Sequence, residues 1–203
     1  ELGCSVMVAT PTAEETKAEI LGVVGVELVV ADIGAGVSDR VRDFDPELVI
    51  VSPGLPPTHP AVVWAHEGGR VVWGDVELAW RLRDKTGTPA EWILVTGTNG
   101  KTTTVQLTAA MLVAGGFRAA PCGNVGVSVL DAVRDPGGFD VLVVELSSFQ
   151  LHYLGDVSPW ASACLNIADD HLDWHGSSAE YRLAKGKVYR NTKVACVFNE
   201  DDP

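Results

Sequence analysis

Short apolar runs rich in β-branched residues recur along the whole chain. They show almost no polar alternation, and they cover residues 4–9, 26–32, 47–52, 70–75, 91–97, 140–146, 161–167 and 193–199. A strand without alternation is buried on both faces, which is typical of a parallel sheet covered by helices. The pattern therefore predicts an α/β fold of the doubly wound type, with ligands bound at the carboxyl ends of the strands.

Helical patterns fill most of the gaps between these runs. The expected helices cover residues 12–21, 59–68, 76–85, 102–116, 128–134 and 178–191. Strands that alternate with helices in this way indicate βαβ units, which strengthens the case for a parallel sheet.

A glycine-bearing loop joins the expected strand at 91–97 to the helix that follows it. The sequence ILVTGTNGKTTTVQL (93–107) departs in one respect from the phosphate-loop pattern G-x-x-x-x-G-K-[ST], because Val95 stands where the leading glycine would be. The strand before the loop and the helix after it are the context that phosphate binding requires. We therefore predict a phosphate-binding loop of a shortened form.

The residue types in this loop suit a polyphosphate. Gly97 and Gly100 permit backbone conformations that a Cβ would forbid, and the loop N–H groups with the helix N-terminus form an anion cradle. Lys101 would reach the outer phosphates, and the Thr102 hydroxyl would ligate Mg²⁺. The predicted phosphate-binding residues are Gly97, Thr98, Asn99, Gly100, Lys101, Thr102 and Thr103.

A carboxylate ends the neighbouring apolar strand. Enzymes that transfer phosphoryl groups commonly place an acidic side chain there to hold Mg²⁺. Four apolar residues precede Glu145, and the run SSF follows one residue later. We expect Glu145 to bind the metal directly.

A charged and then Gly- and Pro-bearing segment at 83–89 precedes the phosphate-loop strand and predicts a domain boundary. We expect an N-terminal Rossmann-like unit over 1–86 and a central P-loop unit over 87–203. The chain opens at Glu1 rather than Met and stops after an expected strand. We expect both units to be incomplete parts of a longer protein.

The balance of charge argues against polyanionic partners. The 203 residues carry a net charge of −12, and Lys and Arg form no basic stripe. Nucleic acid and anionic membranes are therefore not expected as partners. No apolar stretch reaches the roughly 18 residues that a membrane span needs.

The four cysteines are widely spaced and form no C-x-x-C pair. Each lies in or beside an apolar run, and they are Cys4, Cys122, Cys164 and Cys196. Zinc clusters and redox pairs usually contain a C-x-x-C pair, and disulfide scaffolds are typical of secreted chains. We expect buried free thiols in a reducing cytoplasm.

Five motifs, taken together and in this order, resemble the Mur ligase family of peptidoglycan synthesis. They are GTNGKTT (97–103), CGNVG (122–126), VELSSFQL (144–151), LNIADDHLDWHG (165–176) and YRLAKGKVY (181–189). In that family the loop without the leading glycine is the normal form. The runs SPGLPPTHP and GDVEL also resemble the family's N-terminal domain, and ELSSFQL favours the branch that adds D-glutamate.

The resemblance implies an ATP- and Mg²⁺-dependent ligase. Such an enzyme phosphorylates the carboxylate of UDP-N-acetylmuramoyl-L-alanine, and the amine of D-glutamate then attacks the acyl phosphate. A monomer is expected. The family's C-terminal domain, which binds the amino acid, is absent from these residues, so we expect them alone to have little or no ligase activity.

The resemblance also implies roles for individual side chains. His171 matches a ligand of a second Mg²⁺, and Lys185 matches a lysine that carries a carbamate and helps to hold that ion. With Lys101 and Glu145 they form the implied catalytic set. His175, four residues after His171, is expected to be incidental. The implied substrate residues are Ser52, Pro53, Gly54, Asn124, Ser147 and Ser148, with Gln150 beside them.

Three alternatives remain open at this point. The chain could belong to another amino-acid ligase of the family or to the related folyl-polyglutamate synthases. It could be a P-loop NTPase or switch protein, which would hydrolyse nucleotide without an acceptor. It could also be a UDP-sugar-binding module without catalysis, in which binding would not depend on Lys101.

Overall fold

The computed structural model describes residues 3–32, 34, 36–85 and 87–202. The chain forms two compact units. The first comprises Glu1–Val49 and Pro57–Val72, and the second comprises Ile50–Pro56 and Trp73–Pro203. Among the described residues, no helix combines the length and the apolar character that crossing a membrane would require.

The first unit is a small α/β arrangement. Its elements are β1 (Met7–Thr10), α1 (Glu15–Val23), β2 (Glu27–Val30), α2 (Asp39–Phe44) and α3 (Pro60–Glu67). β1 and β2 pair in parallel with α1 between them, as the sequence pattern predicts. β3 (Leu48–Ile50) and β4 (Val71–Trp73) form a separate two-stranded sheet.

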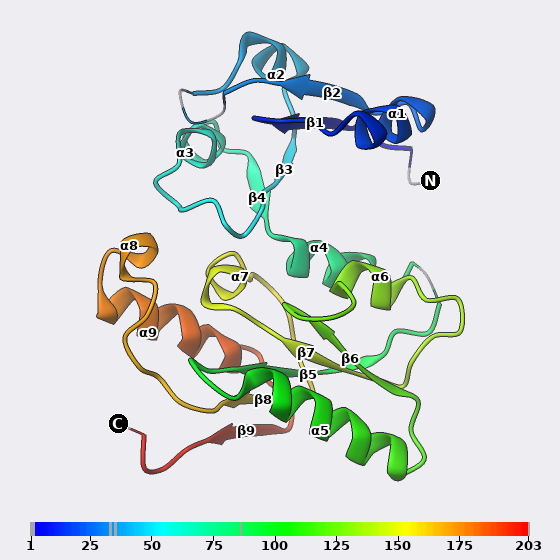
Figure 1. Cartoon of the computed structure of the whole chain (residues 1–203), viewed down its shortest axis with the longest axis vertical. Helices are drawn as coiled ribbons and strands as arrows, with labels where there is room; N and C mark the ends of the chain where they lie inside the picture. The colour runs from blue at the N-terminus through cyan, green and yellow to red at the C-terminus, as the bar shows by residue number, and fades with distance from the viewer. Residues whose placement is uncertain (1–2, 33, 35, 86, 203) are drawn as a thin grey trace. The chain divides into compact units, whose positions relative to one another are not determined.

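The second unit is built on a parallel sheet of five strands in the order β6-β7-β5-β8-β9 (Figure 1). Its strands are β5 (Glu91–Thr96), β6 (Ala119–Gly123), β7 (Val141–Glu145), β8 (Ala161–Cys164) and β9 (Ala195–Phe198). Its helices are α4 (Asp75–Leu82), α5 (Lys101–Ala114), α6 (Val129–Val133), α7 (Ser148–His152), α8 (Leu172–His175) and α9 (Ser178–Gly186), which runs into a 3₁₀ turn at Lys187–Tyr189. The expected α/β class and parallel sheet are confirmed.

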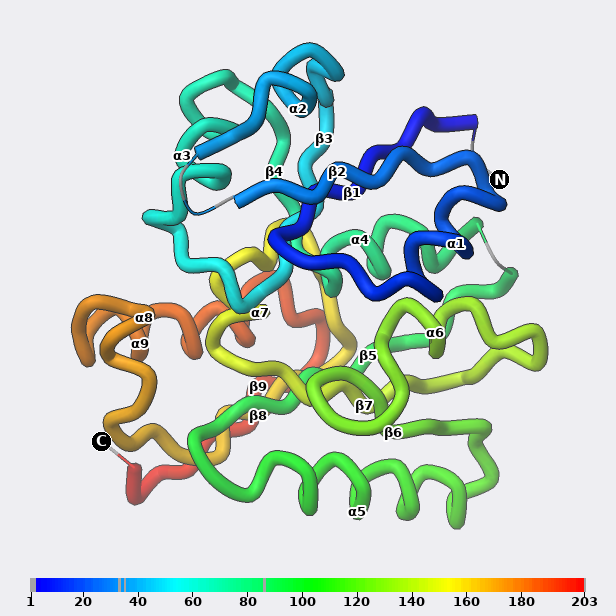
Figure 2. The backbone as a smooth tube through the Cα atoms, turned by 45° about the horizontal axis from the view of Figure 1, so that its top comes forward, coloured from blue at the N-terminus to red at the C-terminus, as the bar shows by residue number. Residues whose placement is uncertain are grey.

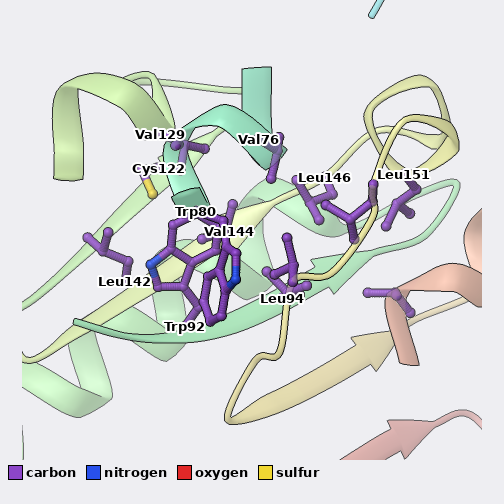
Figure 3. Packing of buried hydrophobic residues seen from close by; sticks show 14 of the residues in the cluster. Val76, Trp80, Trp92, Leu94, Cys122, Val129, Leu142, Val144, Leu146 and Leu151 are labelled. Carbon is purple, nitrogen blue, oxygen red and sulfur yellow. The ribbon is translucent and has the colours of Figure 1, made fainter. Parts of the chain in front are cut away.

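The central strands β5 and β7 carry buried apolar residues on both faces because helices cover both. Helix α5 lies along one face, while α4 and α6 lie on the other (Figures 1 and 2). Trp92 and Leu94 pack toward α4 and α6, whereas Val95 packs toward α5 with Val105. Figure 3 shows Trp92 beside Trp80 of α4, and their rings meet edge to face with centroids 5.0 Å apart. Successive residues of β5 thus enter opposite cores.

The connection order sets the position of the site. The chain leaves the central strand β5 toward β6 and β7 on one side, and later returns to β8 on the other side. In open α/β sheets, ligands bind beyond the carboxyl ends of the strands where the strand order reverses in this way. The ends of β5, β7 and β8 therefore define the place to look for function.

Strand β6 was not expected from the sequence. It contains Pro121, which has no N–H to donate and is normally confined to edge strands. β6 is indeed an edge strand, pairing with β7 alone. The short helices α2, α7 and α8 were also missed, because four to six residues carry too little periodicity to be recognised.

The expectation of four buried thiols was wrong for two of them. Cys122 and Cys164 are buried, but Cys4 and Cys196 are exposed. Cys196 lies on β9, whose four residues are all exposed because this edge strand pairs only with β8. Burial raises the pKa of the Cys122 thiol to about 12, so this side chain acts as a small apolar group.

Helix α4 packs in the core of the second unit, through Val76, Ala79 and Trp80. The compact units therefore separate before this helix, whereas the expected boundary lies after it. Residue 86, within the predicted linker, lies outside the described residues. The domain limits 1–86 and 87–203 stay a prediction.

Candidate functional site

The phosphate-loop prediction falls on a tight turn between β5 and α5. Gly97 has φ of +154° and Gly100 has φ of +81°, conformations that favour glycine. A Cβ on Gly97 would lie 3.1 Å from the Leu165 Cβ. Lys101 is the first residue of α5, so the loop leads directly into the N-terminus of a 14-residue helix.

The loop after β8 holds this turn in place. The Thr98 N–H donates to the Asn166 carbonyl at 2.9 Å. The Asn166 side chain accepts from the Asn99 N–H at 2.8 Å and donates back to the Asn99 carbonyl at 3.0 Å. Sequence reasoning missed Asn166, because the strand expected at 161–167 included it, whereas β8 ends at Cys164. The turn is thus shaped before any ligand arrives.

Two lysine ammonium groups meet at one carbonyl oxygen of the loop. Lys101 Nζ donates to the Gly97 and Thr98 carbonyls at 2.9 and 3.0 Å. Lys185 Nζ donates to the same Gly97 carbonyl at 2.8 Å. The two predicted lysines are therefore brought together at the carboxyl end of β5.

Lys185 is 2% exposed. Burial, with a smaller contribution from the charge of Lys101, lowers the pKa of Lys185 to about 8. Its neighbours explain the burial, because Tyr181 and Ala184 of α9 are also buried and share its helix face, and Val188 of the following 3₁₀ turn is buried as well. A lysine on the apolar stripe of a helix was therefore a signal in the sequence, independent of any family.

Glu145 lies beside the first turn of α5. It is 2% exposed. One carboxylate oxygen accepts from the Thr102 hydroxyl at 2.9 Å, and the other accepts from the Asn124 amide at 3.3 Å. Neither partner is charged, and no cation of the described residues pairs with this carboxylate. A buried carboxylate beside a hydroxyl, without a cationic partner, fits a hard ion such as Mg²⁺.

Gly123 is required by this arrangement. A Cβ there would lie 2.3 Å from the Glu145 carbonyl oxygen, and the residue has φ of +112°. The close approach lets the Asn124 N–H donate to that carbonyl at 2.9 Å. The glycine thereby places the Asn124 amide against the Glu145 side chain.

His171 lies just before α8, and its side chain contacts Phe149 and Asp170. Its ring centroid is 4.8 Å from that of Phe149, and its Nε2 lies 3.4 Å from an Asp170 carboxylate oxygen. About half of its side chain is exposed. The described residues contain no group of three or more His, Cys, Asp and Glu that could hold a metal. The predicted metal role of His171 stays a prediction.

His175 is more closely engaged than expected. Its Nε2 lies 2.9 Å from the hydroxyl oxygen of Ser148, which is 2% exposed. Its ring contacts those of Phe149, Trp174 and Tyr181. Burial lowers the pKa of His175 to about 4, so the ring is neutral near pH 7. The structure thus assigns the ring a defined contact with a predicted substrate residue.

Ser147 and Gln150 have structural partners. They form a capping box at the start of α7, in which the Ser147 hydroxyl accepts from the Gln150 N–H at 3.2 Å. The Gln150 amide donates to Asp75 at 3.1 Å. These contacts account for both side chains without a ligand.

The predicted SPG turn at 52–54 belongs to the second unit. The Leu55 N–H donates to the Ser52 carbonyl at 3.0 Å and closes the turn. The Trp174 indole N–H donates to the Gly54 carbonyl at 3.1 Å, and the Tyr153 hydroxyl donates to the Leu55 carbonyl at 2.6 Å. The turn is therefore fixed by side chains from α8 and from the end of α7.

A cavity of about 450 Å³ lies elsewhere, toward the amino ends of the central strands. Its lining includes Arg83, Arg118 and Asp140. It contains none of the predicted site residues, so the candidate site is the polar carboxyl edge of the sheet.

The glycine loop, its lysine and the buried carboxylate on a parallel sheet form the arrangement typical of an α/β domain of the P-loop type. The sequence model of the Mur ligase middle domain matches residues 95–203, which is more than half of the chain. The chain belongs to the Mur ligase family.

Curated relatives align with the whole chain. One from Leifsonia xyli subsp. xyli, named UDP-N-acetylmuramoylalanine–D-glutamate ligase, is 61% identical over 214 residues, covering 100% of this chain and 41% of the relative. A protein of the same name from Tropheryma whipplei (strain Twist) is 45% identical over 207 residues, covering 100% and 42%. The chain thus spans about two fifths of the length of these relatives.

Solved structures share the fold at low identity. The MurF ligase from Thermotoga maritima in complex with ADP matches with a TM-score of 0.51 and 19% identity, over 77% of this chain and 43% of that one. A murein peptide ligase Mpl from Psychrobacter arcticus matches with a TM-score of 0.50 and 16% identity, over 99% and 45%.

Proposed function

We propose that the chain is part of an ATP-dependent ligase that adds D-glutamate to UDP-N-acetylmuramoyl-L-alanine during peptidoglycan precursor synthesis. The observation that carries this proposal is 61% identity, across the entire chain, to a relative with that name. We further propose that the enzyme acts in the cytoplasm as a monomer.

ATP would bind through the loop at 97–103. The backbone N–H groups of the loop and the start of α5 suit phosphate oxygens, and the Thermotoga maritima relative is described in complex with ADP. The Lys101 ammonium rests on two loop carbonyls and is placed to turn toward a phosphate instead. Thr102 and Glu145 would hold Mg²⁺, which would offset the charge of the phosphates when bound.

The chemistry would proceed in two steps. A substrate carboxylate oxygen attacks the γ-phosphorus, ADP leaves, and an acyl phosphate forms. The amine of D-glutamate then attacks the acyl carbon, inorganic phosphate leaves, and the amine loses a proton. Asn124, Ser147, Ser148 and the turn at 52–54 are the proposed substrate contacts, of which Asn124 already lies at Glu145.

His171 and a carbamylated Lys185 are the proposed ligands of a second Mg²⁺. Carbamylation joins the neutral lysine amine to CO₂ and releases a proton. With a pKa of about 8, roughly a tenth of Lys185 is neutral at pH 7, against less than a thousandth for an ordinary lysine. The lowered pKa supports this proposal.

At fixed dissolved CO₂, carbamate at Lys185 is expected to increase as pH rises from about 7 to 8.5, because the neutral fraction rises through the pKa. ¹³C NMR of the protein under ¹³CO₂ would measure it. Lys185→Arg should remove the signal, whereas Lys187→Arg, two residues along, should retain it. A signal that survives in the Lys185 variant would assign the modification elsewhere.

The function itself is tested on a full-length protein that contains this chain. ATP, UDP-N-acetylmuramoyl-L-alanine and single amino acids are supplied, and phosphate release and product mass are measured. Turnover is expected with D-glutamate. Turnover with a different amino acid, or with a folate acceptor, would indicate another ligase of this kind. Nucleotide hydrolysis without an acceptor, or UDP-sugar binding without turnover, would overturn the proposal.

A further inference from the structure

Helix α8 is a single turn placed directly after His171. His171 before it has φ of +52°, and Gly176 after it has φ of +82°. Left-handed residues at both ends reverse the chain sharply on each side of the turn. The last two residues of α8, Trp174 and His175, both make polar side-chain contacts with other segments of the unit.

Trp174 connects α8 to the turn at 52–55. Its indole N–H is a donor only, and it donates to the Gly54 carbonyl at 3.1 Å. Tyr153, which is 8% exposed, donates to the next carbonyl, that of Leu55, at 2.6 Å. Two successive carbonyls of one turn are thus held by two aromatic side chains.

Aromatic packing fixes the indole in this orientation. The Trp174 ring lies 4.7 Å from that of Phe149 at an interplanar angle of 30°, and 5.3 Å from that of His152 at 81°. The position of the turn is therefore linked to α7, which begins just after Glu145.

Helix α8 also contacts a second predicted substrate residue, Ser148, at the start of α7. His175 adjoins Trp174 and meets the Ser148 hydroxyl at 2.9 Å. One four-residue element therefore contacts both the turn at 52–55 and the start of α7. Substrate contacts are proposed for both of these segments, as they are for Asn124.

We propose that Trp174 is a positioning residue that sets the affinity of the enzyme for the sugar-nucleotide substrate by holding the turn at 52–55 in register with α7. This inference rests on the proposed function. It adds Trp174 to the residues proposed for substrate binding, and Trp174 acts through its hydrogen bond to the Gly54 carbonyl. ATP binding, which takes place at the loop after β5, does not depend on this contact.

Trp174→Phe keeps an aromatic ring and removes the donor. In the full-length protein, the KM for UDP-N-acetylmuramoyl-L-alanine is expected to rise about threefold to tenfold, as one hydrogen bond of ordinary strength implies. The KM for ATP and kcat should stay within about twofold. Calorimetric titration with the same sugar nucleotide should give a matching rise in Kd.

Trp160→Phe is the matched control, because Trp160 is 47% exposed and its recorded bonds are made by its backbone. It should leave all constants unchanged. Tyr153→Phe removes the second donor to the turn and should reproduce the rise, which covers the case of a Trp174 variant that does not fold.

The outcomes separate the two proposals. Unchanged KM and Kd for the sugar nucleotide in folded Trp174→Phe and Tyr153→Phe would overturn the positioning role while leaving the ligase assignment intact. Equal losses in the constants for ATP and for the sugar nucleotide would also overturn it, since they indicate a general structural effect. A wild-type protein that neither binds nor turns over the sugar nucleotide would overturn the proposed function instead.

Discussion

Lys101→Ala in the full-length ligase is expected to lower kcat/KM for phosphate release by roughly three orders of magnitude. The ammonium is the cation at the start of α5, and a positioned charge on a transferring phosphoryl group contributes on this scale. The fold should survive, because the recorded bonds of Lys101 go to the Gly97 and Thr98 carbonyls. Lys185 still donates to Gly97 after the substitution.

Lys193→Ala supplies the control for this measurement. Lys193 pairs with Glu91 at 3.0 Å on the surface, where both side chains are more than two fifths exposed. Such pairs contribute little to stability, so activity and melting temperature should stay near wild type. Activity within tenfold of wild type in Lys101→Ala would show that the loop does not act on the transferring phosphate.

Glu145→Gln should raise the Mg²⁺ concentration needed for half-maximal activity about tenfold to a hundredfold and lower kcat by roughly a hundredfold. The substitution keeps the size of the side chain and removes the charge that would attract the ion. Magnesium titrations of the steady-state rate measure both effects.

Thermal unfolding without metal separates this role from a structural one. The Glu145 carboxylate is buried with a hydroxyl and an amide as partners, and burial disfavours a charge that has no counter-ion. The melting temperature of Glu145→Gln should therefore equal or exceed that of wild type. Glu91→Gln is the matched control, because Glu91 pairs with Lys193 on the surface. It should leave the magnesium requirement unchanged. A large loss of stability with an unchanged magnesium requirement would contradict the metal role.

The fold could be predicted from sequence wherever local pattern and burial agree. The interiors of β5 and β7 are apolar because both faces of these strands are covered, and that pattern is visible in the sequence. Pro121 hides β6, because pairing with β7 decides its conformation against the local preference. α8 is equally hidden, since its single turn depends on the indole and imidazole contacts of Trp174 and His175.

The candidate site divides in the same way. Lys101 and Thr102 follow from the strand, glycine turn and helix that adjoin them in sequence. His175 and Asn166 could not be placed, because their partners Ser148 and Asn99 lie 27 and 67 residues away. For Lys185 the helical stripe of α9 indicates burial, but its position at the Gly97 carbonyl depends on how α9 packs against the end of β5.

The proline in β6 has a further consequence for how the sheet can be extended. The Arg118 carbonyl accepts from the Val141 N–H, and the Asn124 N–H donates to the Glu145 carbonyl. The backbone groups of the even-numbered residues of this segment therefore face β7. Those of the odd-numbered residues, Pro121 among them, face outward. The outward N–H of Gly123 is already bound to Val127. This margin therefore offers few donors to an incoming chain, which protects it from strand swapping and fibre-like association. An additional strand is therefore expected to join beside β9 rather than beside β6.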